Sequence, residues 1–180
     1  LGGKRGLAWG FDSELVNFDR NTGVTGWRFD AAPRIGLDWS GPGYFLRPQA
    51  GYRYTSYSLG NTSPDTNDSP DRQLPFVTVD SGVVLERPSG SRGQRRITLE
   101  PRALYLYTPF RNQDELPVFD TIVPDLNTVQ LFRTTRYTGA DRVSDANQLS
   151  IGVTSRLFET ATGTQFVALT LGQAFYFERT

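Results

Sequence analysis

The feature that most constrains this chain is a series of long runs in which apolar and polar side chains alternate one by one. The cleanest run covers residues 26–39, with Trp27 and Ile35 on one face and Arg28 and Arg34 on the other. A period of two is typical of a β-strand with one apolar and one polar face. The sequence therefore predicts an all-β protein.

Seven such runs are separated by Gly, Pro, Asn and Asp residues. They cover residues 7–18, 26–39, 44–59, 76–87, 96–108, 147–158 and 164–178. Strands of soluble proteins are about 5–6 residues long, whereas a strand that crosses a membrane needs about 9–11. Since no crossover helix separates neighbouring runs, we expect an antiparallel meander of about seven long strands, part of a transmembrane outer-membrane β-barrel.

The lengths of the connections support the same interpretation. Connections after the second, fourth and sixth runs are short, whereas residues 60–75 and 109–146 form long loops. Short turns at one end and long loops at the other are typical of outer-membrane barrels. Only the first connection, 19–23, is short on the long-loop side.

Some positions predict irregular pairing. In the first run the apolar face changes between Phe11 and Val16, and a bulge near residues 12–14 would reconcile the two halves. Pro33, Pro48 and Pro101 interrupt later runs, and proline cannot donate a hydrogen bond to a neighbouring strand. We expect bulges at these three prolines too.

The charged faces of the runs predict a hydrated interior. Charged side chains buried without partners in a dry core would cost several kcal/mol each, so they must face water or one another. The candidates for lining the lumen are Arg28, Arg34, Arg47, Arg53, Glu100, Arg102 and Arg156. The apolar faces, rich in aromatic residues near the strand ends (among them Tyr54 and Tyr57), would then face lipid.

Composition excludes several function classes for this chain of 180 residues. Because it contains no Cys and no His, it has no thiolate nucleophile, imidazole base or Cys/His zinc site. Its 19 basic and 19 acidic side chains balance, which argues against a nucleic-acid surface. No apolar run approaches the roughly 18 residues of a membrane helix. We predict no catalytic residue, no metal site and no cofactor, and expect that the protein is not an enzyme.

Short motifs in a fixed order resemble the LptD family of LPS-assembly proteins from Gram-negative outer membranes. They include LEPR at 99–102, PFRNQ at 109–113, LFR at 131–133, RYTGADR at 136–142 and DANQL at 145–149. Shorter similarities extend the resemblance over nearly the whole chain. It implies a large barrel in the bacterial cell outer membrane that takes part in lipopolysaccharide assembly.

The resemblance also implies partners. They are lipopolysaccharide, the plug lipoprotein LptE, outer-membrane lipid, and a periplasmic Lpt bridge component that reaches the barrel through an amino-terminal domain. No counterpart of that domain, of the strands that form the gate or of the family's disulfide cysteines is found here. We therefore expect residues 1–180 to be an internal part of the barrel domain.

The long segment 109–146 carries its own hypothesis. Its apolar and charged residues could anchor it, so we expect it to fold over or into the barrel mouth and to meet the plug or the sugar portion of lipopolysaccharide. The candidates for these contacts are Phe119, Asp120, Leu131, Phe132, Arg133, Arg136, Asp141 and Arg142. A mobile extracellular loop is the alternative.

Two other architectures remain open from the residues alone. One is a soluble β-sandwich or small barrel that holds a carbohydrate or lipid in its long loops. The other is a generic porin-like barrel. A sandwich would require two sheets packed face to face over a common core.

Overall fold

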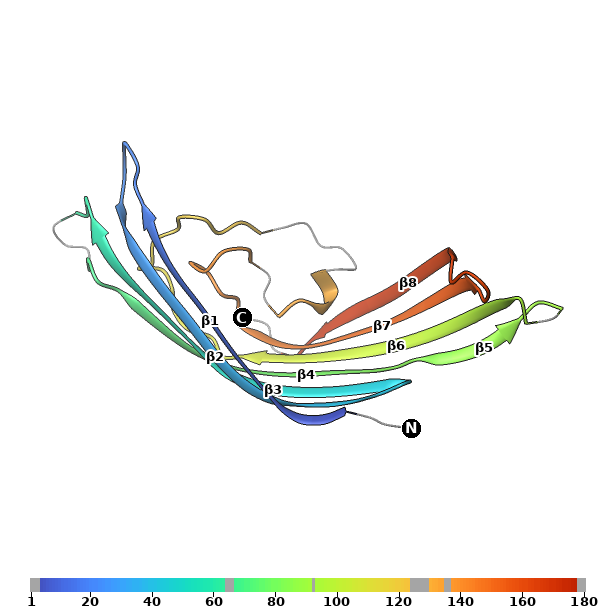
Figure 1. Ribbon diagram of the computed structural model, residues 1–180. Coiled ribbons are helices and arrows are strands. Elements are labelled where there is room, and N and C mark those ends of the chain that lie inside the picture. Colours follow the sequence, from blue (N-terminus) through green and yellow to red (C-terminus); the bar gives the residue numbers. More distant parts are fainter. Residues whose placement is uncertain (1–3, 64–66, 92, 124–129, 135–136, 178–180) are drawn as a thin grey trace.

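The computed structural model describes residues 4–63, 67–91, 93–123, 130–134 and 137–177 (Figure 1). Its strands are β1 (Lys4–Phe18), β2 (Thr25–Gly41), β3 (Tyr44–Gly60), β4 (Asp71–Val83), β5 (Leu85–Ser89), β6 (Arg95–Thr108), β7 (Ala146–Glu159) and β8 (Gln165–Tyr176). A 3-10 turn, η1 (Gln130–Phe132), lies between β6 and β7. None of the helical structure in these ranges is long and apolar enough to cross a membrane.

The strands form one antiparallel sheet in the order β1-β2-β3-β4-β6-β7-β8, and β5 pairs with β6. Apart from β4 and β5, which follow each other in the same register and both pair with β6, each strand pairs with the next one in the chain, which confirms the predicted meander. The sheet is strongly curved but not closed (Figure 1). A second sheet packed on this one is not present in the described residues, so the sandwich alternative is not favoured.

The two faces of the sheet have opposite character, as predicted. Large apolar side chains on the convex face are exposed, for example Trp9 (79%), Ile35 (53%) and Leu171 (64%). Arg28 on the concave face is fully buried beneath the chain segment that connects β6 to β7. Neighbouring residues of a strand point to opposite faces, and paired residues of adjacent strands point to the same face. The register of the β1–β2 and β2–β3 pairs therefore keeps the apolar and the charged side chains on separate faces from one strand to the next.

The predicted bulges at the three prolines are wrong. The register between β2 and β3 is the same before and after Pro33 and before and after Pro48, although pairing is interrupted beside both residues. Between β4 and β5 the pairing with β6 is interrupted at Val83 and Val84, which lie opposite Pro101 and Glu100, and the register again continues unchanged. Each proline therefore leaves a gap in one ladder, because it lacks an N–H, without inserting an extra residue.

The expected bulge in the first strand is also wrong. β1 pairs with β2 without a shift from Lys4 to Phe18, so Phe18 lies on the concave face. It is accommodated there because its ring stacks on Phe119, with the centroids 4.2 Å apart. The described strands contain one register shift, between Leu157 and Phe158 on the β7–β8 ladder.

One strand boundary beside a long loop differs from the sequence prediction. β4 begins at Asp71 rather than near residue 76, so the first long loop is shorter than predicted. The short turns lie at one end of the sheet and the longer connections at the other, with the described parts of residues 109–145 folded back into the concavity (Figure 1). We call residues 109–145 the inner segment.

The buried apolar side chains lie between the inner segment and the concave face. They are Tyr57, Leu74, Leu104, Leu106, Leu116, Ala140 and Val143. Tyr57 was predicted to lie with Tyr54 among the exposed aromatic residues, and this is wrong, because the two positions are three residues apart and point to opposite faces. The hydrophobic core therefore lies between the concave face of the sheet and the inner segment.

Candidate functional site

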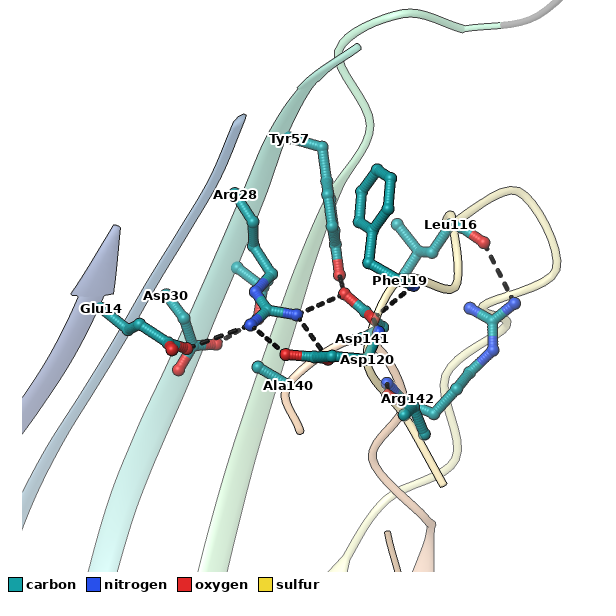
Figure 2. Close-up of polar contacts among 12 residues, drawn as sticks. Glu14, Arg28, Asp30, Tyr57, Leu116, Phe119, Asp120, Ala140, Asp141 and Arg142 are labelled. Atoms are coloured by element: carbon teal, nitrogen blue, oxygen red, sulfur yellow. Dashed lines mark hydrogen bonds and ion pairs between the residues drawn. The ribbon is translucent and has the colours of Figure 1, made fainter. Parts of the chain in front are cut away.

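The centre of the contact is an ion pair between strand β2 and the inner segment. Arg28 and Asp141 are both fully buried, and Arg28 Nη1 donates to Asp141 Oδ1 at 2.6 Å. The same guanidinium donates to both carboxylate oxygens of Asp120 at 2.8 Å and to Glu14 of β1 at 3.1 Å. Figure 2 shows Arg28 entering this cluster from the wall while Asp120 and Asp141 approach from the segment. One cation therefore holds three carboxylates.

Asp141 in turn organises the segment around it. Its Oδ2 accepts hydrogen bonds from the backbone N–H groups of Phe119 and Asp120, at 2.7 and 2.9 Å. Its Oδ1 also accepts from the hydroxyl of Tyr57 on β3, at 3.0 Å (Figure 2). A buried carboxylate needs this number of donors, because each unsatisfied lone pair would add to the cost of removing the charge from water.

A second arginine joins the segment to strand β4. Arg72 is almost fully buried and donates to the carbonyl oxygens of Ala140 and Asp141, at 2.6 and 2.8 Å. It also donates to Thr55, whose hydroxyl donates to Asp30, and Asp30 accepts from Arg53. We call Arg28, Arg72, Tyr57, Asp120 and Asp141 the hub. Its residues come from three strands and from two separate parts of the segment.

Glycine is required at one position beside the hub. Gly139 has a φ of +76°, which disfavours L side chains, and a Cβ atom there would lie 2.9 Å from Asp120 Cγ. This close approach lets the chain pass Asp120 just before it places Ala140 and Asp141 against the wall. The glycine of the RYTGADR motif thus has a steric role.

The segment is also braced internally. Arg142 donates to the carbonyl oxygen of Leu116 at 3.0 Å and to that of Gln113. The amide of Gln113 pairs with the backbone of Val143 in both directions, and its oxygen accepts from Arg72. These bonds join the first and last thirds of the segment, which are otherwise about 30 residues apart.

The charges of the hub shift the pKa of one of its carboxylates, that of Asp120. Hydrogen bonds from Arg28 hold the pKa of Asp120 below its ordinary value, and the partial burial of the side chain opposes this shift. The carboxylate is thus ionised when the contact is made.

A second contact joins the segment to strands β7 and β8. Gly152 and Gly172 lie directly opposite each other in the ladder, and the side chains of Phe132 and Leu131 cover them. A Cβ atom on Gly152 would lie 2.8 Å from Phe132 Cζ, and one on Gly172 would overlap Leu131. The guanidinium of Arg102 lies over the Phe132 ring at 4.6 Å and is paired with Asp80. We call Gly152 and Gly172 the seat.

The remaining predicted lumen residues pair with carboxylates on neighbouring strands. Arg34 pairs with Asp12, Arg53 with Asp30, Arg47 with Asp38, Arg102 with Asp80 and Arg156 with Glu100. Most of these guanidinium groups are still a third to nearly a half exposed. The concave wall is therefore charged, close to neutral and open to water.

A cavity of about 460 Å³ lies on this wall beneath the seated turn. Its charged lining comes from Arg47, Asp80, Glu100, Arg102 and Arg156, and the Phe132 ring forms one side. Thr154 and Thr170, whose hydroxyls are 3.0 Å apart, also line it. In the part of the chain that the structure describes, no group of three or more acidic side chains is placed so that it could hold a metal ion.

Comparison with known proteins identifies the family. The family model for LPS transport system D, LptD, matches residues 2–180. The chain belongs to the LptD family. The LptD resemblance predicted from the ordered motifs is thereby confirmed.

Curated LptD relatives are similar over almost all of this chain. An LPS-assembly protein LptD of Xanthomonas campestris pv. campestris is 46% identical over 174 residues, which cover 93% of this chain and 22% of that protein. LptD proteins of Aromatoleum aromaticum and Nitrosococcus oceani are 40% and 42% identical, each over 96% of this chain and 22% or 24% of their own length. The chain thus spans about a fifth to a quarter of these relatives.

The LptD motifs contribute unequally to the contacts. Of the predicted contact residues, Phe119, Asp120, Asp141 and Arg142 belong to the hub or its bracing, and Leu131 and Phe132 to the seat contact. Arg133 lies exposed after the turn, and Arg136 lies outside the described residues. Sequence reasoning missed Glu14, Tyr57, Arg72 and Gln113. No sequence signal revealed Arg72 or its partners, because Leu74 and Phe76 reverse the alternation that Thr78 and Asp80 follow later in the same strand.

Proposed function

We propose that this sheet is part of the wall of a transmembrane barrel in the bacterial outer membrane. The observation that carries the proposal is the pairing of an exposed apolar convex face with a charged concave face on strands that, apart from the five-residue β5, are 12–17 residues long. Contiguous exposed apolar surface on this scale marks contact with lipid or protein. Residues 1–180 would then be one part of the LptD barrel domain.

We further propose that the complete protein takes part in lipopolysaccharide assembly, as the names of its relatives suggest. In this proposal Arg34, Arg47, Arg53, Glu100, Arg102 and Arg156 line the lumen, and Arg28 lies on the same face but is buried under the inner segment. Paired, half-exposed charges suit a water-filled passage for the polar part of an amphiphile, because they offer hydrogen bonds without a strong field of one sign. The protein would act by passage and assembly and not by catalysis.

A test of the membrane proposal compares two adjacent residues of β7 in the full-length protein. Val153→Arg on the convex face should cost roughly 2–4 kcal/mol in lipid, whereas Thr154→Arg on the concave face should cost less. Folding yields of both variants in bilayers report the difference, with the parent protein as reference. Equal yields would contradict a lipid-facing convex surface.

We also propose the partners that the family resemblance implies: lipopolysaccharide, LptE as a plug within the lumen, and the periplasmic Lpt bridge through another domain. Asp141 and Phe119 of the inner segment contact the wall, so a plug would meet the opposite side of the segment. Exposed apolar side chains are available there, among them Val118 (51%) and Ile122 (69%).

The plug contact can be tested by co-purification from the outer membrane. Ile122→Asp should reduce recovery of LptE with the full-length protein, whereas Glu115→Gln, an exposed change in the same segment, should not. Deletion of residues 120–135 should have a larger effect and should raise permeability to large antibiotics. Normal LptE recovery and an intact barrier in the deletion would exclude a role for the segment in either.

A further inference from the structure

The inner segment is attached to the wall at two places of unequal strength. At the hub, Arg28 and Asp141 are fully buried and every carboxylate accepts at least one charge-assisted hydrogen bond. At the seat, the contact consists of Leu131 and Phe132 against two glycines and one cation–π contact with Arg102. Leu131 and Phe132 are each only partly buried. The seat contact is therefore the weaker of the two.

The seat is shaped to receive the turn. Strand glycines weaken a sheet unless something approaches the backbone closely, and here two glycines face each other across the β7–β8 ladder under two apolar side chains. The missing side chains create a shallow depression in the wall, and the ring of Phe132 enters it. The guanidinium of Arg102, which is paired with Asp80, lies over the ring.

The turn also closes one side of the charged cavity. Phe132 is its apolar boundary, while Arg47, Glu100 and Arg156 line the wall beneath. If the ring leaves the seat, Gly152 and the guanidinium of Arg102 become open to the lumen, and the cavity joins the rest of the concave space.

We propose that the η1 turn is a displaceable lid over this cavity, that Gly152 and Gly172 are the surface on which it closes, and that the hub is its fixed attachment. The inference rests on the proposed function only in taking the concave face as the water-filled side of the wall. It assigns to Gly152, Gly172 and Phe132 a role in controlling access from the lumen to the charged cavity on the wall. Displacement would expose a polar cavity suited to a hydrated or charged group.

The test measures access to a reporter cysteine at Thr154, which lines the cavity. In the full-length protein in its native membrane, Thr154→Cys is treated with a membrane-impermeant thiol reagent and the labelling rate is recorded. Val153→Cys, on the opposite face, should label much more slowly. If both label equally, the proposed orientation of the sheet fails, and this outcome is separate from the lid.

The lid is then tested in the Thr154→Cys background. Phe132→Ala should increase the labelling rate several-fold, and Gly152→Ala should do the same because its methyl group displaces the ring. Gly6→Ala is the matched control, since a Cβ atom at Gly6 meets nothing within 4 Å and should leave the rate unchanged.

A compensating pair distinguishes the seat from a general defect. Gly172→Ala should increase labelling, and adding Leu131→Ala should bring the rate back towards that of the parent, because the smaller side chain makes room for the new methyl group. Heat-modifiable migration in gels verifies that each variant is folded. Parent-like rates in both Phe132→Ala and Gly152→Ala, or no recovery on adding Leu131→Ala, would overturn the proposal.

Discussion

The hub and the seat hold the same segment to the same sheet, but they use different kinds of interaction. The hub joins β2, β3 and β4 to the segment through two buried arginines and a buried carboxylate. The seat joins β7 and β8 to it through apolar contact with glycines and a half-exposed arginine. Removing one partner from a buried ion pair leaves the other charge uncompensated, whereas removing an apolar contact loses only its own contribution. The two contacts should therefore respond very differently to substitution.

The largest effect is expected at the centre of the hub. Asp141→Ala removes the acceptor of Arg28, Tyr57 and two backbone N–H groups, and should lower the free energy of unfolding by about 3–5 kcal/mol. Guanidinium unfolding of the refolded full-length protein measures the change. Asp114→Ala, an exposed position of the same segment, is the control. A midpoint for Asp141→Ala equal to that of the control would show that the hub does not stabilise the segment.

The next effect separates backbone strain from steric contact. Gly139 and Gly163 both have a positive φ, +76° and +74°, but a Cβ atom meets Asp120 only at Gly139. Alanine should cost about 1–2 kcal/mol from strain at either position, with an additional cost at Gly139 from the displaced carboxylate. The same unfolding measurement gives both values. Equal losses would mean that Asp120 moves aside freely.

A smaller loss is expected at the seat. Phe132→Ala should lower the free energy of unfolding by about 1–2 kcal/mol, since the ring is only partly buried. The hub and seat contact different strands, so the double variant with Asp141→Ala should show nearly additive losses. Strong coupling in this cycle would show instead that the two contacts form one cooperative unit.

The smallest effect depends on pH. The pKa of Asp120 is lowered in the folded protein, so its contribution to stability is present above the unfolded-state pKa and is lost as the pH falls through the folded-state value. The difference in unfolding midpoint between the parent and Asp120→Asn should be constant from pH 7 to about pH 5 and shrink below about pH 4. Phe132→Ala should show no comparable narrowing. A difference between the parent and the Asp120→Asn variant that grows on acidification would contradict the assigned direction.

The sequence by itself determined the sheet and the character of its two faces. Alternation such as Trp27 and Ile35 against Arg28 and Arg34 specifies both the strand and its exposed side, because a period of two is a local property of extended backbone. The alternation predicted the strand pairing less reliably where a proline interrupts it, since a missing N–H produces either a bulge or a gap in the pairing. At Pro33, Pro48 and Pro101 the structure has a gap in the strand pairing and no bulge, which depends on the neighbouring strands.

The hub was decided by the tertiary structure alone. Arg28 and Asp141 are 113 residues apart, and Arg28 has many carboxylates on strand faces as equally plausible partners in the sequence. The choice was made by the curvature of the sheet, which brings the inner segment back over β2, and by Gly139, which lets the chain pass Asp120 closely. The same holds for Gly152 and Gly172, which become a seat only because the ladder sets them opposite each other and the segment returns above them. Such pairings depend on long-range geometry, and local periodicity carries no information about it.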